Sequence, residues 1–186
     1  MKHQLSRAAL AGCAFLGAAA VAPASAADEP VRAYAVIKGC DDPGIQGRLE
    51  LVERPSVEGV KLVDVKLELQ GAADGKHAVH IHEVGACKPC SEAKGHFDPG
   101  PAGKSAPDGN HPYHSGDLIN IEVRGASGVM QTTTSRITLS PGPLSVFDPD
   151  GSSVIVHTDP DTYCPEGEIK GCAGGGRIAC GVIVKE

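Results

Sequence analysis

The segment 61–70 reads KLVDVKLELQ, in which apolar and polar residues alternate almost without interruption. Successive side chains of a β-strand point to opposite faces, so this alternation predicts a strand with one face in a core and the other in water. Turns rich in Gly, Pro, Asn and Asp separate it from seven further short runs of this kind: 32–38, 46–53, 77–83, 118–124, 129–137, 153–157 and 178–184. Eight short strands and no long helical pattern in 186 residues predict an all-β fold, an antiparallel sandwich or barrel forming one domain.

Two intervals between the predicted strands, 85–116 and 158–177, are long, irregular and rich in Gly, Pro and Cys. Long loops of a compact domain usually carry function, and loops without regular structure need cross-links. Cysteines lie in both intervals, and candidate metal ligands lie in or beside both. We therefore expect these two loops to be functional.

The first 26 residues have the pattern of an export signal. Lys2 and Arg7 provide a positive start, an apolar stretch follows over about 8–22, and 24–26 (Ala-Ser-Ala) fits the small-x-small cleavage rule. The apolar stretch is shorter than the roughly 20 residues that a membrane-spanning helix needs, so no membrane span is expected. Residues 10–13 (Leu-Ala-Gly-Cys) also match a lipoprotein cleavage box, which leaves lipid anchoring at Cys13 as an alternative.

Removal of residues 1–26 leaves a single domain, 27–186, and changes the formal net charge from −6 to −8, because two basic residues and no acids are lost. An acidic domain without a basic run is not expected to bind nucleic acid. An even number of cysteines in an exported chain favours disulfides over free thiols. The mature chain would contain six: Cys40, Cys87, Cys90, Cys164, Cys172 and Cys180.

Seven of the eight histidines lie between positions 77 and 157. Histidine is the commonest protein ligand for copper and zinc. In a strand, His80 and His82 lie on the same face about 7 Å apart, so both rings can reach one ion. A solvent-facing pair is the alternative. His77 falls on the opposite face, where we expect a buried histidine that ties strands or loops together.

A second cluster is His114 with Asp117, three residues later. The two can meet on one turn, and mixed nitrogen and oxygen ligation suits zinc, although such a pair alone is often a surface feature. His96 lies between the two clusters in sequence. His157 ends an apolar run, where a lone histidine would be structural. One shared site accounts for all these features together, so the sequence predicts a metal centre.

These residues carry a resemblance to exported bacterial copper/zinc superoxide dismutases over essentially the whole mature chain. The resemblance rests on the order and separation of five motifs: 77–82 (HAVHIH), 95–99 (GHFDP), 114–118 (HSGDL), 154–157 (VIVH) and 176–183 (GRIACGVI). It implies an eight-stranded Greek-key β-barrel with two long functional loops that holds one copper and one zinc ion.

The resemblance also implies a role for each candidate residue. His96 would bridge the two metals, Arg177 would lie beside copper, and Lys170 would guide the incoming anion. Asp161 would link a copper histidine to a zinc histidine. The implied copper ligands are His80, His82, His96 and His157. The implied zinc ligands are His96, His114, Asp117 and one further histidine.

That further histidine is where the chain departs from the family pattern. Bacterial members carry it about nine residues after the bridging histidine, behind Gly-Lys, whereas here Gly103-Lys104 is followed by Ser105. The only spare histidine is His111, which we expect to complete the zinc site. The alternatives are an exposed loop histidine and an incomplete zinc site.

The resemblance implies one disulfide, between Cys90 and Cys180. Cys164 and Cys172 bracket a short loop segment, so we expect them to pair with each other, which leaves Cys40 with Cys87. A redox or metal motif formed by Cys87 and Cys90 is the alternative.

The implied activity is conversion of superoxide to oxygen and hydrogen peroxide by Cu(II)/Cu(I) cycling, with zinc as the structural metal and His96 and Arg177 as catalytic residues. A copper-only dismutase, should His111 not bind zinc, and a non-catalytic copper-binding or delivery module are the alternatives. The protein would be periplasmic or extracellular, and superoxide would be its small-anion partner. Family members dimerise through different faces or stay monomeric, which leaves a homodimer open.

Overall fold

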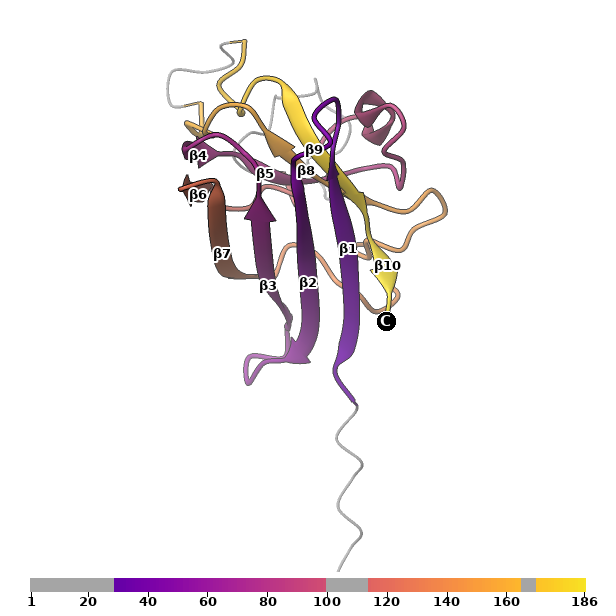
Figure 1. Ribbon diagram of the computed structural model, residues 1–186. Coiled ribbons are helices and arrows are strands. Elements are labelled where there is room, and N and C mark those ends of the chain that lie inside the picture. The colour runs from indigo at the N-terminus through magenta and orange to yellow at the C-terminus, as the bar shows by residue number, and fades with distance from the viewer. Residues whose placement is uncertain (1–28, 100–113, 165–169) are drawn as a thin grey trace, which may run out of the picture.

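The computed structural model describes residues 29–99, 114–164 and 170–186 (Figure 1). The predicted export signal with Cys13, and His111, lie outside these ranges. The regular secondary structure of the described chain is all strand apart from one short 3-10 helix, η1 (Cys90–Ala93). Its strands are β1 (Val31–Gly39), β2 (Gln46–Pro55), β3 (Lys61–Gln70), β4 (Gly75–His77), β5 (Val79–His82), β6 (Ile121–Arg124), β7 (Ser127–Thr134), β8 (Ser153–His157), β9 (Arg177–Val182) and β10 (Val184–Lys185).

The strands form one antiparallel sheet in the order β4-β6-β7-β3-β2-β1-β9-β8-β5, with β10 paired to β1. The two ends of this order meet because β4 and β5 are separated only by Ala78. Ala78 N donates to Asp159 O and Ala78 O accepts from His157 N, both within 3.0 Å. The sheet therefore closes into a nearly complete barrel, and β3–β7 and β1–β9 are Greek-key neighbours, adjacent in the sheet but not in sequence.

The prediction of an all-β antiparallel barrel is confirmed. Segments 61–70 and 153–157 match β3 and β8 in full, and each of the other predicted runs overlaps a strand. The described residues form ten strands rather than eight because two predicted runs are divided. The run 77–83 changes partner at Ala78, from β6 to β8, and the run 178–184 breaks at Ile183, whose N–H donates to Ser152 O.

The barrel interior is filled by alternate residues of the strands, as Leu49 and Leu51 of β2 illustrate. β5 and β8 differ, because every residue of both is buried. Val79 and Ile81 of β5 belong to the main core, so His80 and His82 face the other side. The long loops cover that side, and this places the metal candidates under a protein layer outside the barrel.

The first long loop pairs with the free edge of β5. Ile81 N donates to Gly116 O, Phe97 N donates to Ile81 O, and both distances are 2.9 Å. Gly116 is required here, because a Cβ at this position would lie 2.2 Å from Ile81 O. This pairing sets His96 opposite His82 and Asp117 opposite His80.

One carboxylate occupies a core-facing position at the end of β2. Glu53 is 5% exposed and accepts hydrogen bonds from Leu139 N at 2.6 Å and Ser140 N at 2.9 Å. Burial alone would raise the pKa of the Glu53 carboxyl, but the hydrogen bonds from Ser140, Leu139 and Lys61 outweigh it and the pKa is lowered.

We predict that Glu53→Gln lowers the free energy of unfolding by about 1.5–3 kcal/mol at neutral pH, because hydrogen bonds to a buried charge are lost. A lowered folded-state pKa stabilises the protein above the unfolded pKa of about 4.3, and this contribution disappears as the pH falls through the folded pKa. Urea unfolding across this pH range should therefore show the two proteins converging at acidic pH. An equal difference at neutral and strongly acidic pH would contradict the assignment.

Candidate metal centre

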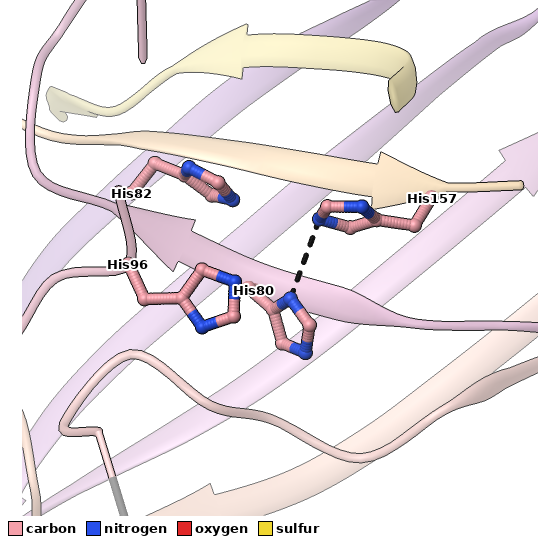
Figure 2. A group of neighbouring side chains, drawn as sticks. All are labelled: His80, His82, His96 and His157. Carbon is pink, nitrogen blue, oxygen red and sulfur yellow. Dashed lines mark hydrogen bonds between the residues drawn. The ribbon is translucent and has the colours of Figure 1, made fainter. Parts of the chain in front are cut away.

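Four histidines from three parts of the chain converge on one point (Figure 2). His80 and His82 come from β5, His157 ends β8, and His96 follows η1. Each offers a ring nitrogen, and these nitrogens all lie within 4.8 Å of one another. His80, His82 and His157 are buried and His96 is nearly so. The structure thus brings together all the copper ligands that the sequence predicts.

Hydrogen bonds on the far side of three rings place their protons away from this point. His80 Nε2 lies 2.9 Å from Asp161 Oδ2, His82 Nδ1 lies 2.9 Å from Lys94 O, and His157 Nδ1 lies 3.2 Å from Gly175 O. Each of these oxygens accepts a hydrogen bond, so the ring nitrogen beside it carries the proton. The second nitrogen of each neutral ring therefore presents a lone pair to the shared point.

This arrangement fits a metal ion. His80 Nδ1 and His157 Nε2 are 3.3 Å apart, and two lone pairs at that distance repel unless a cation lies between them. The remaining nitrogen, His82 Nε2, is buried and has no hydrogen-bond partner among the described residues. A buried nitrogen without a partner is costly, and metal coordination would satisfy it.

The electrostatic environment keeps these rings neutral, as metal ligands must be. Burial, reinforced by neighbouring histidines, lowers the pKa of His80, lowers that of His82 well below its ordinary value and lowers that of His157 to about 3. Four imidazoles with no carboxylate among them form a donor set that suits copper.

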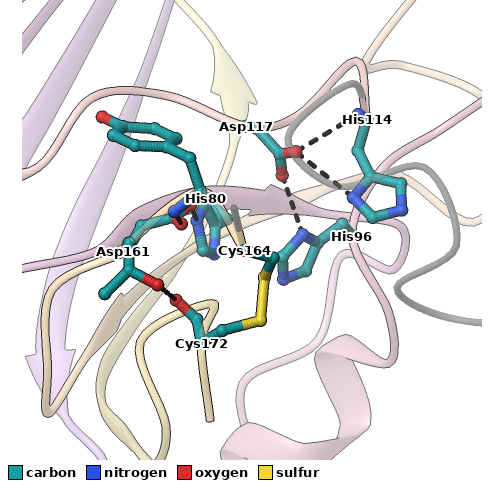
Figure 3. Close-up of a disulfide and its surroundings, with 9 residues drawn as sticks. His80, His96, His114, Asp117, Asp161, Cys164 and Cys172 are labelled. Carbon is teal, nitrogen blue, oxygen red and sulfur yellow. Dashed lines mark hydrogen bonds and ion pairs between the residues drawn. A yellow bond between two sulfur atoms is a disulfide. The ribbon is translucent and has the colours of Figure 1, made fainter. Parts of the chain in front are cut away.

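A second, mixed donor set shares His96 (Figure 3). The Asp117 carboxylate contacts His96 Nδ1 through Oδ1 at 2.8 Å and His114 Nδ1 through Oδ2 at 3.2 Å. The turn predicted from the three-residue spacing brings His114 and Asp117 together, with Asp117 N donating to His114 O. Two imidazoles and a carboxylate are typical zinc ligands, and zinc takes four. His111, predicted to be the fourth, lies outside the described residues.

An open cavity of about 410 Å³ leads to the four-histidine group. His82, His96 and His157 line it together with Lys170 and Arg177. Lys170 is exposed, whereas Arg177 is half-buried, and burial lowers the pKa of its guanidinium. Arginine nevertheless remains charged at neutral pH, so the cavity wall carries a positive group beside the histidines.

Backbone carbonyls hold Arg177 in place. Arg177 Nη1 donates to Cys90 O at 2.7 Å, and Nη2 donates to Lys94 O. The Lys94 carbonyl also accepts from His82 Nδ1, so one carbonyl orients both a candidate ligand and the arginine. Sequence reasoning missed Lys94, because the group involved is a peptide carbonyl that no residue type identifies.

Asp161 lies behind His80 and makes one of the two histidine contacts expected of it, the one to a copper-ligand candidate. Its Oδ2 accepts from His80 Nε2, and its Oδ1 accepts from Tyr163 N at 2.6 Å. Asn120, which no pattern in the sequence singles out, makes two hydrogen bonds with the Asp161 backbone. Its Nδ2 donates to the Asp161 carbonyl at 2.9 Å, and its Oδ1 accepts from the Asp161 amide at 2.8 Å. The predicted structural role of His77 is confirmed, because its ring nitrogens contact His157 O at 2.8 Å and Ala73 O at 2.9 Å.

Two of the predicted disulfides are wrong. Cys90 bonds to Cys40 rather than to Cys180, and Cys87 bonds to Cys180 rather than to Cys40. Cys40 follows the end of β1 and Cys180 lies in β9, and these strands are neighbours in the sheet. The segment 87–90 crosses both, so four cysteines gather in one place and sequence spacing cannot distinguish their pairings.

The third predicted disulfide, Cys164–Cys172, is confirmed. Because Cys87 and Cys90 each form a disulfide with a distant cysteine, a reduced Cys-x-x-Cys metal motif is excluded for this structure.

Comparison with known proteins agrees with this geometry. The sequence model of the family described as copper/zinc superoxide dismutase (SODC) matches residues 45–183. The chain belongs to the copper/zinc superoxide dismutase family.

Superoxide dismutase [Cu-Zn] 2 of Aquifex aeolicus (strain VF5) is 38% identical over 144 residues, which cover 74% of this chain and 78% of that protein. The extracellular superoxide dismutase [Cu-Zn] of Drosophila melanogaster is 30% identical over 162 residues, or 83% of this chain and 85% of that one. Among solved structures, the clock protein EA4 superposes with a TM-score of 0.67 at 28% identity, covering 83% of this chain and 94% of that chain.

The described part of the chain contains no helix that is long and apolar enough to cross a membrane.

We predict that metal binding strongly stabilises the fold, because it satisfies buried nitrogens that the metal-free protein leaves facing one another. At a free metal concentration a thousand times the dissociation constant, the gain is about 4 kcal/mol. This corresponds to a rise of roughly 8–16 °C in the midpoint of thermal unfolding for a domain of this size.

Calorimetry of chelator-treated protein with and without added copper and zinc measures this effect. The variant His82→Ala, which removes one donor, should show a smaller rise. An equal rise in both proteins would place the stabilising ions elsewhere.

Proposed function

We propose that the protein is a superoxide dismutase that converts superoxide to oxygen and hydrogen peroxide. The observation that carries this proposal is the convergence of neutral histidine nitrogens at the base of a cavity whose wall holds a fixed arginine. Membership of the copper/zinc superoxide dismutase family supports the same activity.

In this proposal, His80, His82, His96 and His157 hold copper, and His96, His114 and Asp117 hold zinc together with His111. When bound, copper supplies the one-electron redox change, whereas zinc has no redox chemistry and fixes the geometry. The histidines are suited to this because their far-side hydrogen bonds hold the rings in one orientation.

His96 is the group placed to handle protons, because it belongs to both donor sets. Its Nδ1 is directed to the Asp117 carboxylate, so Nε2 is the atom that would take up a proton and return it to the forming peroxide. His96 and Arg177 are therefore the proposed catalytic residues.

Arg177 would bind the incoming anion. Its guanidinium is fixed by Cys90 O and Lys94 O, so it needs no rearrangement when the anion enters. Lys170, at the same cavity, would add attraction at longer range. Local positive charge matters because the protein as a whole is acidic, with a formal net charge of −6.

We further propose that residues 1–26 are an export signal, that 27–186 form the mature domain, and that the protein works in the periplasm or outside the cell, as exported bacterial members do. The extracellular Drosophila relative supports export. Lipid anchoring through Cys13 and formation of a homodimer are alternatives to a free monomer.

We predict that Arg177→Ile retains both metals but lowers the second-order rate constant for superoxide by about 10-fold or more, because the focusing charge is lost. The rate should also fall less steeply as ionic strength increases. Pulse radiolysis over a salt series measures both quantities. Arg124→Ile, at an exposed position on β6, is the matched control with the same change in net charge. Equal rates in the two variants would remove the assigned role from Arg177.

We predict that His111→Ala loses zinc while it keeps copper, because the other zinc ligands then number only three. Elemental analysis of purified protein, combined with a superoxide-decay assay, also separates the alternatives. Copper with activity but no zinc in the unmodified protein would indicate a copper-only dismutase, and copper without activity would indicate a binding or delivery module. Full zinc content in His111→Ala would show that another group completes the site.

A further inference from the structure

Two consecutive residues next to the metal centre have a backbone conformation that is unfavourable for their type. Tyr163 has φ 61° and Cys164 has φ 44°, and neither is glycine. Positive φ is uncommon for non-glycine residues because Cβ crowds the backbone, and it persists only where the surroundings enforce it. The turn formed by Tyr163 and Cys164 therefore needs an external restraint.

The second long loop supplies that restraint (Figure 3). Cys164 is bonded to Cys172. The Cys172 carbonyl accepts two hydrogen bonds from Thr162, from N at 2.9 Å and from Oγ1 at 3.1 Å. The next residue, Ala173, pairs with Asp161 as an isolated antiparallel bridge. The disulfide thus closes a small framework around the strained turn.

The strained turn determines how the Asp161 carboxylate is oriented. Tyr163 N donates to Oδ1 at 2.6 Å, which directs Oδ2 toward His80 Nε2 at 2.9 Å. The Asp161 and His80 side chains are only 1% and 0% exposed, so water does not compete for this contact. Asn120 holds the Asp161 backbone but does not touch the carboxylate. Among the described residues, the amide of Tyr163 is therefore a backbone contact that turns the carboxylate toward the histidine.

We propose that the Cys164–Cys172 disulfide is a positioning element for His80. By holding Tyr163 and Cys164 at positive φ, it keeps the Tyr163 amide on Asp161 and so keeps Asp161 on the His80 ring. The inference rests on the proposed function for the identity of the ion as copper, whereas the chain of contacts from the disulfide to the ring is independent of it.

The test compares the unmodified protein with Cys164→Ala/Cys172→Ala, which lacks the bridge. The first readout is the solvent-exchange rate of the His80 Nε2 proton, measured by NMR on metal-free protein. The second is the rate at which a chelator removes copper from loaded protein. We expect both rates to rise about 10-fold, since loss of an outer hydrogen bond typically weakens metal binding by 10–100-fold.

The matched control is Cys87→Ala/Cys180→Ala, which removes a disulfide between the first long loop and β9 and leaves the Cys164–Cys172 bridge in place. It should leave the His80 proton exchange within about 2-fold of the unmodified rate. A similar increase in both disulfide variants would mean that the exchange reports general loosening of the fold, and it would overturn the proposal.

A second variant, Cys164→Gly/Cys172→Ala, separates positioning from simple tethering. Glycine adopts positive φ without strain, so the cost at one of the two strained positions disappears and both rates should fall below those of the alanine variant, toward the unmodified values. If the disulfide acts only by restricting motion, the more flexible glycine variant will exchange as fast as the alanine variant or faster. That outcome would overturn the proposal.

The two readouts also distinguish this inference from the proposed function. Accelerated His80 proton exchange in the alanine variant supports the positioning role even if the unmodified protein takes up no copper, a result that would instead overturn the proposed function. Unchanged exchange and unchanged copper release in the alanine variant would overturn the positioning role while leaving the proposed function intact.

Discussion

The metal centre depends on the hydrogen bonds that hold three histidine rings from behind. A buried imidazole can place its proton on either nitrogen, and only one choice leaves a lone pair for a metal. Here Asp161, Lys94 O and Gly175 O make that choice for His80, His82 and His157. Two of the three acceptors are peptide carbonyls, so the chemistry of the site is determined by the path of the loops that carry them.

The barrel determines the path of those loops. The first loop adds its backbone to the open edge of β5, which aligns His96 and Asp117 with the two histidines of that strand. The second loop packs closely over the end of β8 at Gly174, where a Cβ would lie 2.8 Å from the Cβ of His157. Disulfides also hold both loops in place. Two of them join the first loop to the end of β1 and to β9, and the third links two residues within the second loop.

Much of this could be predicted from the sequence, since hydrophobic alternation is a local signal. The alternation in 61–70 predicted β3 to the residue, and the two-residue spacing of His80 and His82 predicted their shared face. The three-residue spacing of His114 and Asp117 likewise predicted their contact.

Features that arise from tertiary packing could not be predicted. The predicted partners of Cys87 and Cys90 are wrong because both cysteines lie close to Cys40 and to Cys180. Only the path of the chain between Cys87 and Cys90 decides which partner each one reaches. The contributions of the Lys94 carbonyl and of Asn120 leave no pattern in the sequence. The positive φ of Tyr163 contradicts the preference of its residue type, and such a contradiction is expected where tertiary contacts serve a functional site.

In the proposed function, the four-histidine group holds the copper that reacts with superoxide. This is tested by titrating copper into zinc-loaded protein and following superoxide decay by pulse radiolysis at each point. We expect the rate constant to rise in proportion to bound copper and to reach a plateau at one copper per chain. Full occupancy of the four-histidine group, established by spectroscopy, with no acceleration of superoxide decay would contradict it.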